Sequence, residues 1–560
     1  MDKPWLKFYE PGVPETLKIP ETPLFALLEG AAKDFPDNIA CIFLGKEKTY
    51  QQVNEEANRL ANALEKLGIK QGDVIGIMLG NMPQFLIAFF GALKVGAILT
   101  LINPLYQGPE IQFQLNDSNA KALIIIDIMH DNYAKIRENT KVEHTIVTTM
   151  ADAFPGMQVS FSPPEGVKGY YLWADLLKAA EPKPPKVTIE PKETPAVLLY
   201  TGGTTGVPKG AILTHHNLVA NTYQCNSWIP FAERGAGDTT LAVLPFFHSF
   251  GLTVCMLNTI NLADRLVLHP RPDLDQVLRD IPRYNVQFFP GVPTLYASLL
   301  QREDLDQYDL KSMTACLSGA APLPMAVAKA FEEIAGANLV EGYGLTEASP
   351  VTHANPIQQK PPFDKKREGS VGIPMPSTLA KIIDLDTSED LPPGQEGELV
   401  IKGPQVMQGY WNKPDETAKQ LTGDGWLRTG DIAKMDEDGY FYIVDRAKQM
   451  IDRAGFKVWP RDVEEVLYDH PKIAEAAVFG IPDEQRGETV MAVVVLKEGE
   501  EITAEEIIEY TKDKLAYYKR PQFVEFRDEL PKSMVGKVLR RVLQEEHLEK
   551  IGKKTIVDRK

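Results

Sequence analysis

The sequence predicts a mixed α/β protein: a large N-terminal domain of two helix-covered sheets plus a small β-barrel, and a small α+β C-terminal domain. Three observations predict this class. Short apolar runs alternate with helical patterns through most of the first 350 residues, which is typical of parallel sheets covered by helices. Short strands with closely spaced turns replace that alternation over 369–445. A compact mixture of strand and helix patterns follows residue 445.

The first block alternates regularly between helix and strand. Residues 50–69 carry apolar side chains at helical spacing, and 73–79 have the pattern of a buried strand. The pattern then predicts a helix at 85–94 and strands at 97–102, 121–127 and 144–149. Because these strands are apolar along their length, we expect helices on both faces of the sheet.

The apolar stretch 85–102 also has the length of a membrane span. Lys94 lies in its middle, two glycines interrupt it, and Asn103-Pro104 ends it. We therefore interpret the stretch as a buried helix followed by a buried strand, in preference to a transmembrane helix.

A second alternating block extends from residue 196 to about residue 350. Its predicted strands are short apolar runs that end at turn residues: AVLLYT, TTLAVLP, RLVLHP, VQFFPGVP and MTACLSG. Proline and charged residues are frequent over 155–195, between the two blocks, and we expect that segment to lie on the surface.

We place the main domain boundary at 445–448. The N-terminal domain, 1–445, then comprises α/β subdomains at about 1–195 and 196–368 and a β-rich subdomain at 369–445. In the C-terminal domain, 446–560, the patterns predict a helix and three strands, at 504–515 and at 474–483, 488–500 and 523–533.

Composition narrows the function. The formal net charge is −17, and an acidic surface disfavours non-specific binding to nucleic acid and electrostatic docking on anionic lipid. The four cysteines form no CxxC pair, so we expect reduced, mostly buried thiols in place of a disulfide framework or a zinc site. The N-terminus has no signal-peptide pattern, and we expect a cytoplasmic protein.

A glycine- and threonine-rich loop, YTGGTTGVPKG at 200–210, follows the strand at 196–201. Glycines let backbone N–H groups converge on an anion, threonines add hydroxyl donors, and Lys209 adds positive charge. In a P-loop NTPase, Ser or Thr follows the lysine, but Gly210 stands there, and the kinase pattern GxGxxG is absent. The loop therefore predicts a phosphate site of another kind.

This loop resembles the signature of the adenylate-forming, or AMP-binding, superfamily, which includes acyl-CoA synthetases, adenylation domains and luciferases. The resemblance implies that the loop binds the phosphates of ATP. The residues concerned are Thr201, Gly202, Gly203, Thr204, Thr205, Gly206 and Lys209.

Further motifs resemble that superfamily in the same order. LPFFHSFG at 244–251 resembles the border of the acyl pocket, which assigns Phe247 and His248 to it. SGAAPLP at 318–324 resembles the loop that lines the adenine pocket, with Gly319, Ala320 and Ala321.

The stretch VEGYGLTEASP at 340–350 resembles the adenine and magnesium motif. The resemblance implies that Tyr343 stacks on adenine, Thr346 contacts phosphate and Glu347 holds Mg²⁺. A carboxylate beside a triphosphate would repel it, so a cation between the two is expected. The same nucleotide site includes Glu341, Gly342 and Gly344.

C-terminal motifs complete the resemblance. DGWLRTGD at 424–431 has the form found in fatty-acyl-CoA synthetases and implies that Asp431 binds the ribose hydroxyls, with Arg446 as a second nucleotide contact. Lys448 matches the hinge about which the C-terminal domain rotates. Lys537 matches the lysine that reaches the substrate carboxylate and the α-phosphate. The strand that approaches coenzyme A is matched by Gly455, Phe456 and Lys457, with Ala454 in place of the usual glycine.

These motifs imply an ATP-dependent, AMP-forming ligase that activates a fatty acid as an acyl-adenylate and transfers the acyl group to coenzyme A. Mg²⁺ is the implied cofactor, and the predicted catalytic residues are Thr204, Lys209, Glu347 and Lys537. The resemblance is strongest to bacterial long-chain fatty-acid–CoA ligases. A ligase for medium-chain or aryl acids and a non-catalytic protein that binds acyl groups or nucleotides stay open as alternatives. The resemblance allows a homodimer and peripheral contact with the inner face of the membrane, and it implies no nucleic-acid partner.

Overall fold

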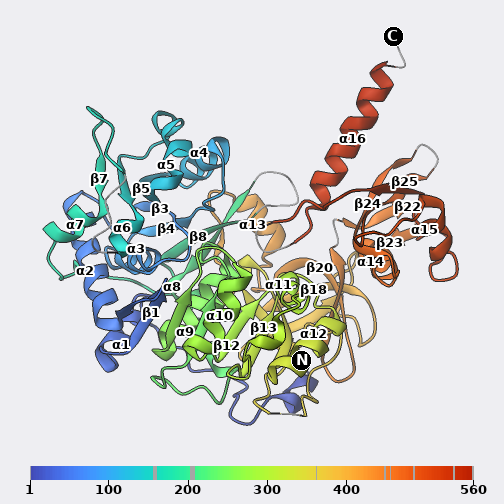
Figure 1. Ribbon diagram of the computed structural model, residues 1–560, viewed down its shortest axis with the longest axis horizontal. Helices are drawn as coiled ribbons and strands as arrows, with labels where there is room; N and C mark the ends of the chain where they lie inside the picture. The colour runs from blue at the N-terminus through green and yellow to red at the C-terminus, as the bar shows by residue number, and fades with distance from the viewer. Residues whose placement is uncertain are drawn as a thin grey trace. The chain divides into compact units, whose positions relative to one another are not determined.

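Four sheets organise the chain in the computed structural model, which describes residues 2–154, 161–201, 208–360, 362–446, 449–454, 456–483, 486–533 and 537–557 (Figure 1). The contacts divide the chain into two compact units, one of 1–379 and 401–427 and the other of 380–400 and 428–560. Helices pack on the larger sheets, which confirms the predicted α/β class. The predicted domain boundary at 445–448 stays a prediction.

An eight-stranded sheet is built mainly from the first block. It is parallel from β8 to β7, and antiparallel where β9 joins β8 and where β19 joins β9. Its strands, in spatial order, are β19 (Gly409–Tyr410), β9 (Lys209–Thr214), β8 (Pro195–Thr201), β4 (Ile98–Leu101), β3 (Val74–Met78), β5 (Ala120–Ile126), β6 (His144–Thr148) and β7 (Tyr170–Leu172).

A nine-stranded sheet carries most of the second block. It is parallel in its middle, from β14 to β1, and antiparallel at both ends. Its order is β16 (Ile373–Pro374), β15 (Val351–Ala354), β14 (Asn338–Gly344), β13 (Ala315–Ser318), β12 (Phe288–Gly291), β10 (Thr239–Ala242), β11 (Arg265–Leu268), β1 (Ile39–Phe43) and β2 (Lys46–Thr49). The two hairpin strands near the N-terminus therefore join the sheet of the second block.

Two smaller sheets belong to the second unit. One has the order β17 (Leu379–Ile383), β18 (Gly397–Lys402), β20 (Leu427–Met435) and β21 (Phe441–Arg446). The other has the order β23 (Phe456–Val458), β22 (Ile451–Arg453), β25 (Gly487–Leu496) and β24 (Ile473–Asp483), and β26 (Phe523–Phe526) pairs with β25.

Several helices begin at residues that cap them. Thr49 and Gln52 form a reciprocal capping box at the start of α2, and Thr214 and Thr503 cap α8 and α15 in the same way. The α-helices are α1 (Ala26–Asp34), α2 (Tyr50–Lys66), α3 (Pro83–Lys94), α4 (Gly108–Asp117), α5 (His130–Ala134), α6 (Met150–Ala153), α7 (Trp173–Ala179), α8 (His215–Ser227), α9 (Asn258–Leu262), α10 (Leu274–Tyr284), α11 (Pro293–Leu300), α12 (Met325–Ala335), α13 (Pro414–Gln420), α14 (Pro460–Tyr468), α15 (Ala504–Thr511) and α16 (Arg540–Val557).

The apolar stretch at 85–102 forms α3 and β4, as predicted. Every residue of α3 is buried, and α2 packs closely on it: a Cβ at Gly91 would lie 2.9 Å from the carbonyl oxygen of Ala57. Lys94 is tolerated there because its Nζ donates to Asn54 and Asn58, each at 2.6 Å, and pairs with Glu29 at 2.9 Å. Within the part of the chain that the structure describes, none of the helices is both long enough and apolar enough to cross a membrane.

One segment differs from its predicted form. The stretch expected to form a small barrel supplies the four-stranded sheet, and its short strands β16 and β19 pair instead with the edges of the two large sheets. The segment at 155–195 was expected on the surface, and its described residues are exposed or half-buried apart from Trp173 and Ala180. This segment also contains β7 and α7.

All four cysteines are free and buried, as the sequence predicts.

Candidate active site

The predicted adenine loop and the predicted adenine motif meet at the carboxyl ends of two neighbouring strands. In the parallel pair β13–β14, Ser318 lies opposite Glu341, so the loop after Ser318 lies beside 342–344. A Cβ at Gly319 would lie 3.4 Å from the carbonyl oxygen of Gly342 and 3.1 Å from the Phe250 ring. Ala320 has a left-handed backbone, with φ of 68°. Gly319 is buried, Ala320 is exposed and Ala321 is half-buried, so small side chains border this edge.

Tyr343 lies next to this edge, on β14. It pairs with His353 of β15, and the two ring centroids are 6.0 Å apart. Burial lowers the pKa of His353 to about 3, so this imidazole is neutral at physiological pH. Tyr343 is only half-buried and keeps part of its ring accessible.

The turn after β14 brings Thr346 and Glu347 into the same region. A Cβ at Gly344 would lie 2.2 Å from the carbonyl oxygen of Pro350, so the tight turn requires glycine there. The hydroxyl oxygens of Thr346 and Ser249 are 3.4 Å apart, which joins this turn to the predicted acyl-pocket segment. In that segment, Phe247 and His248 are half-buried, and Nδ1 of His248 accepts from the backbone N–H of Phe250 at 3.2 Å.

Glu347 is held from two sides. Its Oε1 accepts from the Tyr410 hydroxyl at 2.8 Å, and its backbone carbonyl accepts from the N–H of Met407 at 2.8 Å. Burial and the charge of Glu347 raise the pKa of Tyr410, so this hydroxyl stays protonated and donates. A half-buried carboxylate of fixed orientation is a suitable Mg²⁺ ligand, since Mg²⁺ in nucleotide sites commonly takes one or two carboxylates plus phosphate oxygens.

Lys209 lies beside this pair. β8 and β9 pair up to Thr201 and Lys209, which stand opposite each other where the connecting loop begins and ends. The Lys209 side chain is 12 % exposed; its Nζ lies 5.2 Å from the centre of the Tyr410 ring and forms an ion pair with Glu416 of α13. Strand β19 makes this possible, because Tyr410 lies opposite Ala211 of β9.

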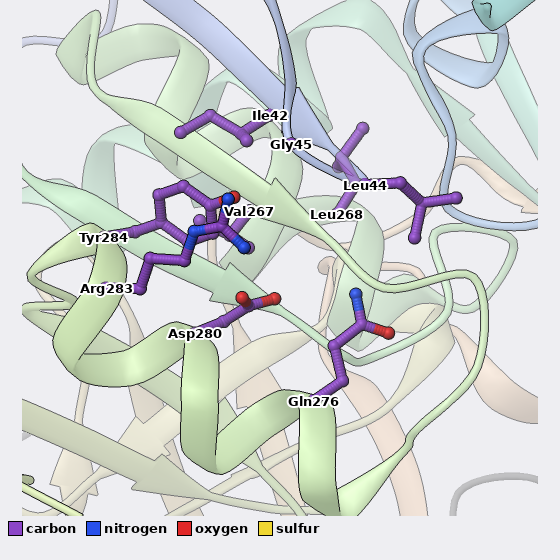
Figure 2. A pocket seen from close by; sticks show the side chains of 9 residues that line it. All are labelled: Ile42, Leu44, Gly45, Val267, Leu268, Gln276, Asp280, Arg283 and Tyr284. Carbon is purple, nitrogen blue, oxygen red and sulfur yellow. The ribbon is translucent and has the colours of Figure 1, made fainter.

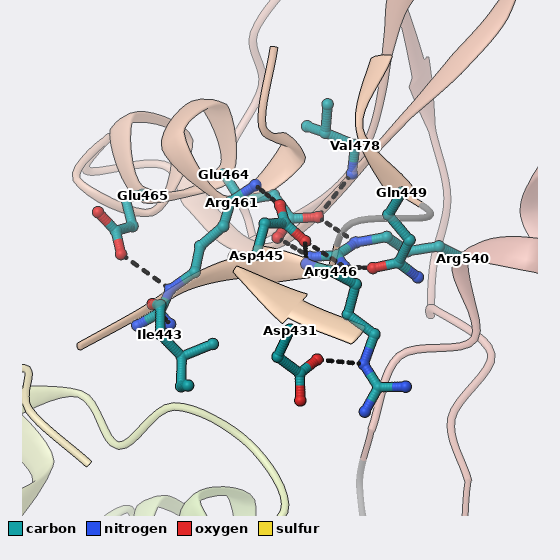
Figure 3. A network of polar contacts seen from close by, with 10 residues as sticks. All are labelled: Asp431, Ile443, Asp445, Arg446, Gln449, Arg461, Glu464, Glu465, Val478 and Arg540. Carbon is teal, nitrogen blue, oxygen red and sulfur yellow. Dashed lines mark hydrogen bonds and ion pairs between the residues drawn. The ribbon is translucent and has the colours of Figure 1, made fainter. Parts of the chain in front are cut away.

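A second cluster lies within the other unit, on β20 and β21. Asp431 is buried and pairs with Nε of Arg446 at 2.9 Å, and the two residues face each other across the strand pair (Figure 3). Lys537 belongs to the same electrostatic cluster. The positive charge of Arg446 is the main cause that lowers the pKa of Lys537 to about 8, and Asp431 opposes that shift.

A polar network surrounds the strand end that precedes the predicted hinge (Figure 3). Asp445 accepts from the backbone N–H groups of Arg446 at 2.6 Å and Arg461 at 2.8 Å. Arg540 pairs with Glu464 through two nitrogens and donates to Gln449 at 2.6 Å. Asp445 and Gln449, on either side of the predicted hinge, are therefore tied to α14 and to the first turn of α16.

The predicted coenzyme A strand carries an aromatic cluster. Phe456 is 46 % exposed and stacks on Tyr518, with centroids 4.7 Å apart. Buried Arg453 donates from one nitrogen to the carbonyl oxygens of Tyr518 at 2.8 Å and of Tyr517 and Arg520 at 3.3 and 3.2 Å. Ala454 takes the left-handed backbone, with φ of 55°, that glycine would adopt more easily. Lys457 is exposed on the same strand.

The structure therefore brings most of the predicted residues into two clusters. Sequence reasoning missed Tyr410, Glu416 and Arg453. The sequence carries no local signal for these three residues, because their partners lie far away in the chain or are backbone carbonyl groups. Seven predicted residues lie outside the described part of the chain: Gly202, Gly203, Thr204, Thr205, Gly206, Lys448 and Gly455.

A separate pocket lies between the β1–β2 turn, β11 and α10 (Figure 2). Its polar lining comes from one face of α10: Gln276, Asp280, Arg283 and Tyr284. Asp280 also lies 3.2 Å from Nε2 of the buried His269. No predicted site residue lines this pocket.

Known proteins resemble the chain along its whole length. The sequence profile of the AMP-binding enzyme family matches residues 28–411, and that of the AMP-binding enzyme C-terminal domain matches residues 462–537. A long-chain-fatty-acid–CoA ligase of Bacillus subtilis (strain 168) is 42 % identical over 98 % of this chain and 98 % of its own.

Two solved structures have the same fold. The anthranilate CoA ligase AuaEII in complex with anthranoyl-AMP is 28 % identical, with a TM-score of 0.82 over 94 % of this chain and 98 % of its own. ATP-bound MatB from Rhodopseudomonas palustris is 28 % identical, with a TM-score of 0.82 over 94 % of this chain and 99 % of its own.

Proposed function

The chain belongs to the AMP-binding enzyme family, and from this premise we propose how its residues divide the work of joining a fatty acid to coenzyme A. The protein is an ATP-dependent, AMP-forming long-chain fatty-acid–CoA ligase, and it uses Mg²⁺. The observation that carries this activity is the match along nearly the whole chain to a long-chain-fatty-acid–CoA ligase.

The reaction has two steps. In the first, an oxygen of the fatty-acid carboxylate attacks the α-phosphorus of ATP, and the bond from that phosphorus to pyrophosphate breaks. In the second, the sulfur of coenzyme A attacks the acyl carbonyl, AMP leaves, and the thiol proton is released. The first step is needed because oxide is a very poor leaving group, whereas AMP is a good one.

We assign the phosphate end of the nucleotide to the cluster around Tyr410. Lys209 supplies positive charge beside the loop that follows Thr201, and Glu347 supplies the carboxylate for a metal ion. Mg²⁺ bound there would neutralise phosphate charge and orient the phosphates. The Tyr410 hydrogen bond supports this role, because it fixes the carboxylate before any ligand arrives.

We assign adenine to the carboxyl edge of β13 and β14. The edge offers the exposed Ala320 and the half-buried Ala321 and Tyr343. Asp431, oriented by Arg446, would accept hydrogen bonds from the ribose hydroxyls. Phe247 and His248 would border the fatty-acid carboxylate.

Lys537 would stabilise the first transition state by electrostatic attraction. Because the pKa of Lys537 is about 8, the amine is mostly protonated at pH 7 and can offset the charge that develops on the α-phosphate. We propose that the C-terminal domain then rotates about Lys448, which would withdraw Lys537 and bring Phe456 and Lys457 toward coenzyme A.

Pyrophosphate release tests the activity. With ATP, Mg²⁺ and palmitate we expect one equivalent of pyrophosphate per enzyme without coenzyme A, and continuous turnover with it. Release without thioester formation would indicate a stand-alone adenylation enzyme, and absence of release would contradict a ligase. A series of acids from six to eighteen carbons, together with benzoate and 4-coumarate, separates long-chain preference from the medium-chain and aryl alternatives.

We also propose that the enzyme is cytoplasmic, forms a homodimer, and contacts the inner face of the membrane peripherally, since its substrate partitions into lipid. Sedimentation of the purified protein would test the dimer: a single species of monomer mass would contradict it.

A further inference from the structure

One ion pair in the candidate site has no part in the proposed reaction. Lys209 pairs with Glu416, which lies in the first turn of α13, and Glu416 also pairs with Lys419 at 2.6 Å. The cation that would bind phosphate is thus already bound by a carboxylate of the same chain.

The surroundings make this pair stronger than an ordinary surface pair. The Lys209 side chain is 12 % exposed and that of Glu416 is 29 % exposed, so water screens the pair only in part. Hydrogen bonds from Lys209 and then from Lys419 lower the pKa of Glu416 to about 2. The carboxylate therefore keeps its charge throughout the pH range in which the enzyme works.

Glu416 is also held in place by its helix. The Oγ1 of Thr417 accepts from the backbone N–H of Tyr410 at 2.8 Å and donates to the carbonyl of Lys413 at 3.0 Å. These bonds tie the first turn of α13 to β19, the strand that also carries the partner of Glu347. The backbone of Glu416 is therefore anchored, and the negative charge of Glu416 stays near Lys209 when a ligand enters.

We propose that Glu416 is a built-in competitor of the phosphate chain of ATP, holding Lys209 in the nucleotide-free protein and releasing it when the triphosphate binds. This inference rests on the proposed function of Lys209. Phosphate and carboxylate compete for the same ammonium group, and the displaced carboxylate then repels the phosphates. Glu416 therefore lowers ATP affinity, and its effect grows with the number of phosphates.

The test compares Glu416→Gln with Asp415→Asn, which removes the same charge from the same exposed helix turn without touching Lys209. Equilibrium binding of the α,β-methylene analogue of ATP and of AMP is measured by calorimetry, with Mg²⁺ present. We expect Glu416→Gln to bind the ATP analogue about fivefold more tightly, AMP to change less than twofold, and Asp415→Asn to bind both as the unaltered protein does. Glu416→Ala should reproduce the result if the glutamine variant does not fold.

If both Glu416 variants bind the ATP analogue as the unaltered protein does, or more weakly, the inference is wrong. Glu416 would then be a residue that positions Lys209 for phosphate binding. Equal tightening for AMP would also overturn it, because the effect would then not depend on the phosphate chain. Failure of the proposed function has a different signature: the unaltered protein would not bind the ATP analogue at all.

Discussion

At the scale of single residues, Lys537 shows how neighbouring charge sets the chemistry of a side chain. Its pKa of about 8 lies below that of ordinary lysine chiefly because Arg446 carries a positive charge nearby. A lysine with a lowered pKa loses its charge as the pH rises through that value.

We therefore expect the single-turnover rate of acyl-adenylate formation to fall as the pH rises through about 8. Lys537→Ala should slow this half-reaction by about 10²- to 10³-fold and spare thioester formation from supplied acyl-AMP. Lys532→Ala is the matched control, since Lys532 pairs with Glu475 at 2.7 Å on the surface. If Lys537→Ala slows both half-reactions equally, Lys537 does not act in acyl-adenylate formation alone.

Tyr410 is the second residue for which the geometry makes a prediction. Its hydroxyl donates to the charged carboxylate of Glu347, and hydrogen bonds to charged groups are worth about 1.5–3 kcal/mol. Tyr410→Phe should raise the Mg²⁺ concentration for half-maximal pyrophosphate release about tenfold at fixed ATP.

Tyr442→Phe serves as the control for that change, because it removes a hydroxyl that donates to another carboxylate, Asp436, at 3.1 Å. If both variants require the same Mg²⁺ concentration as the unaltered protein, Tyr410 does not orient Glu347.

At the scale of elements, the turn between β14 and β15 is sterically constrained. A Cβ at Gly344 would collide with the carbonyl of Pro350 at 2.2 Å, and this turn positions Thr346 and Glu347. Gly344→Ala should lower the melting temperature by several degrees and weaken ATP binding at least tenfold.

Gly423→Ala provides a comparison at a glycine where a Cβ would meet nothing within 4 Å. If the Gly344→Ala protein has the same melting temperature and the same affinity for ATP as the Gly423→Ala protein, the turn does not require glycine.

Most elements could be predicted from the sequence because they are amphipathic or wholly apolar over several turns or residues. The strands predicted at 73–79 and 144–149 form β3 and β6, and the helix predicted at 504–515 begins at Ala504. The strand β7 was not predicted, since three half-buried residues at a sheet edge leave almost no periodic signal. Strand β19, which brings Tyr410 to the site, was missed because two residues are too few to show a period.

At the scale of the whole molecule, the net charge of −17 governs long-range interactions. We expect binding to vesicles to decrease as the fraction of anionic phosphatidylserine in phosphatidylcholine rises, measured by flotation at low salt. Stronger binding to anionic vesicles would contradict this and would require a local basic surface that outweighs the overall field.

The sequence by itself determined the α/β class, the order of the motifs and a phosphate-binding loop, because these follow from local patterns and from residue types at short spacing. The nucleotide and carboxylate chemistry came from the resemblance of those motifs to a known superfamily. Only the tertiary structure decided that Tyr410 holds Glu347 and that Glu416 holds Lys209. These partners lie 63 and 207 positions apart in the chain. The pairing of β19 with β9 brings these distant residues together. This pairing is made by backbone hydrogen bonds, which do not depend on the side chains and so cannot be predicted from the residue types.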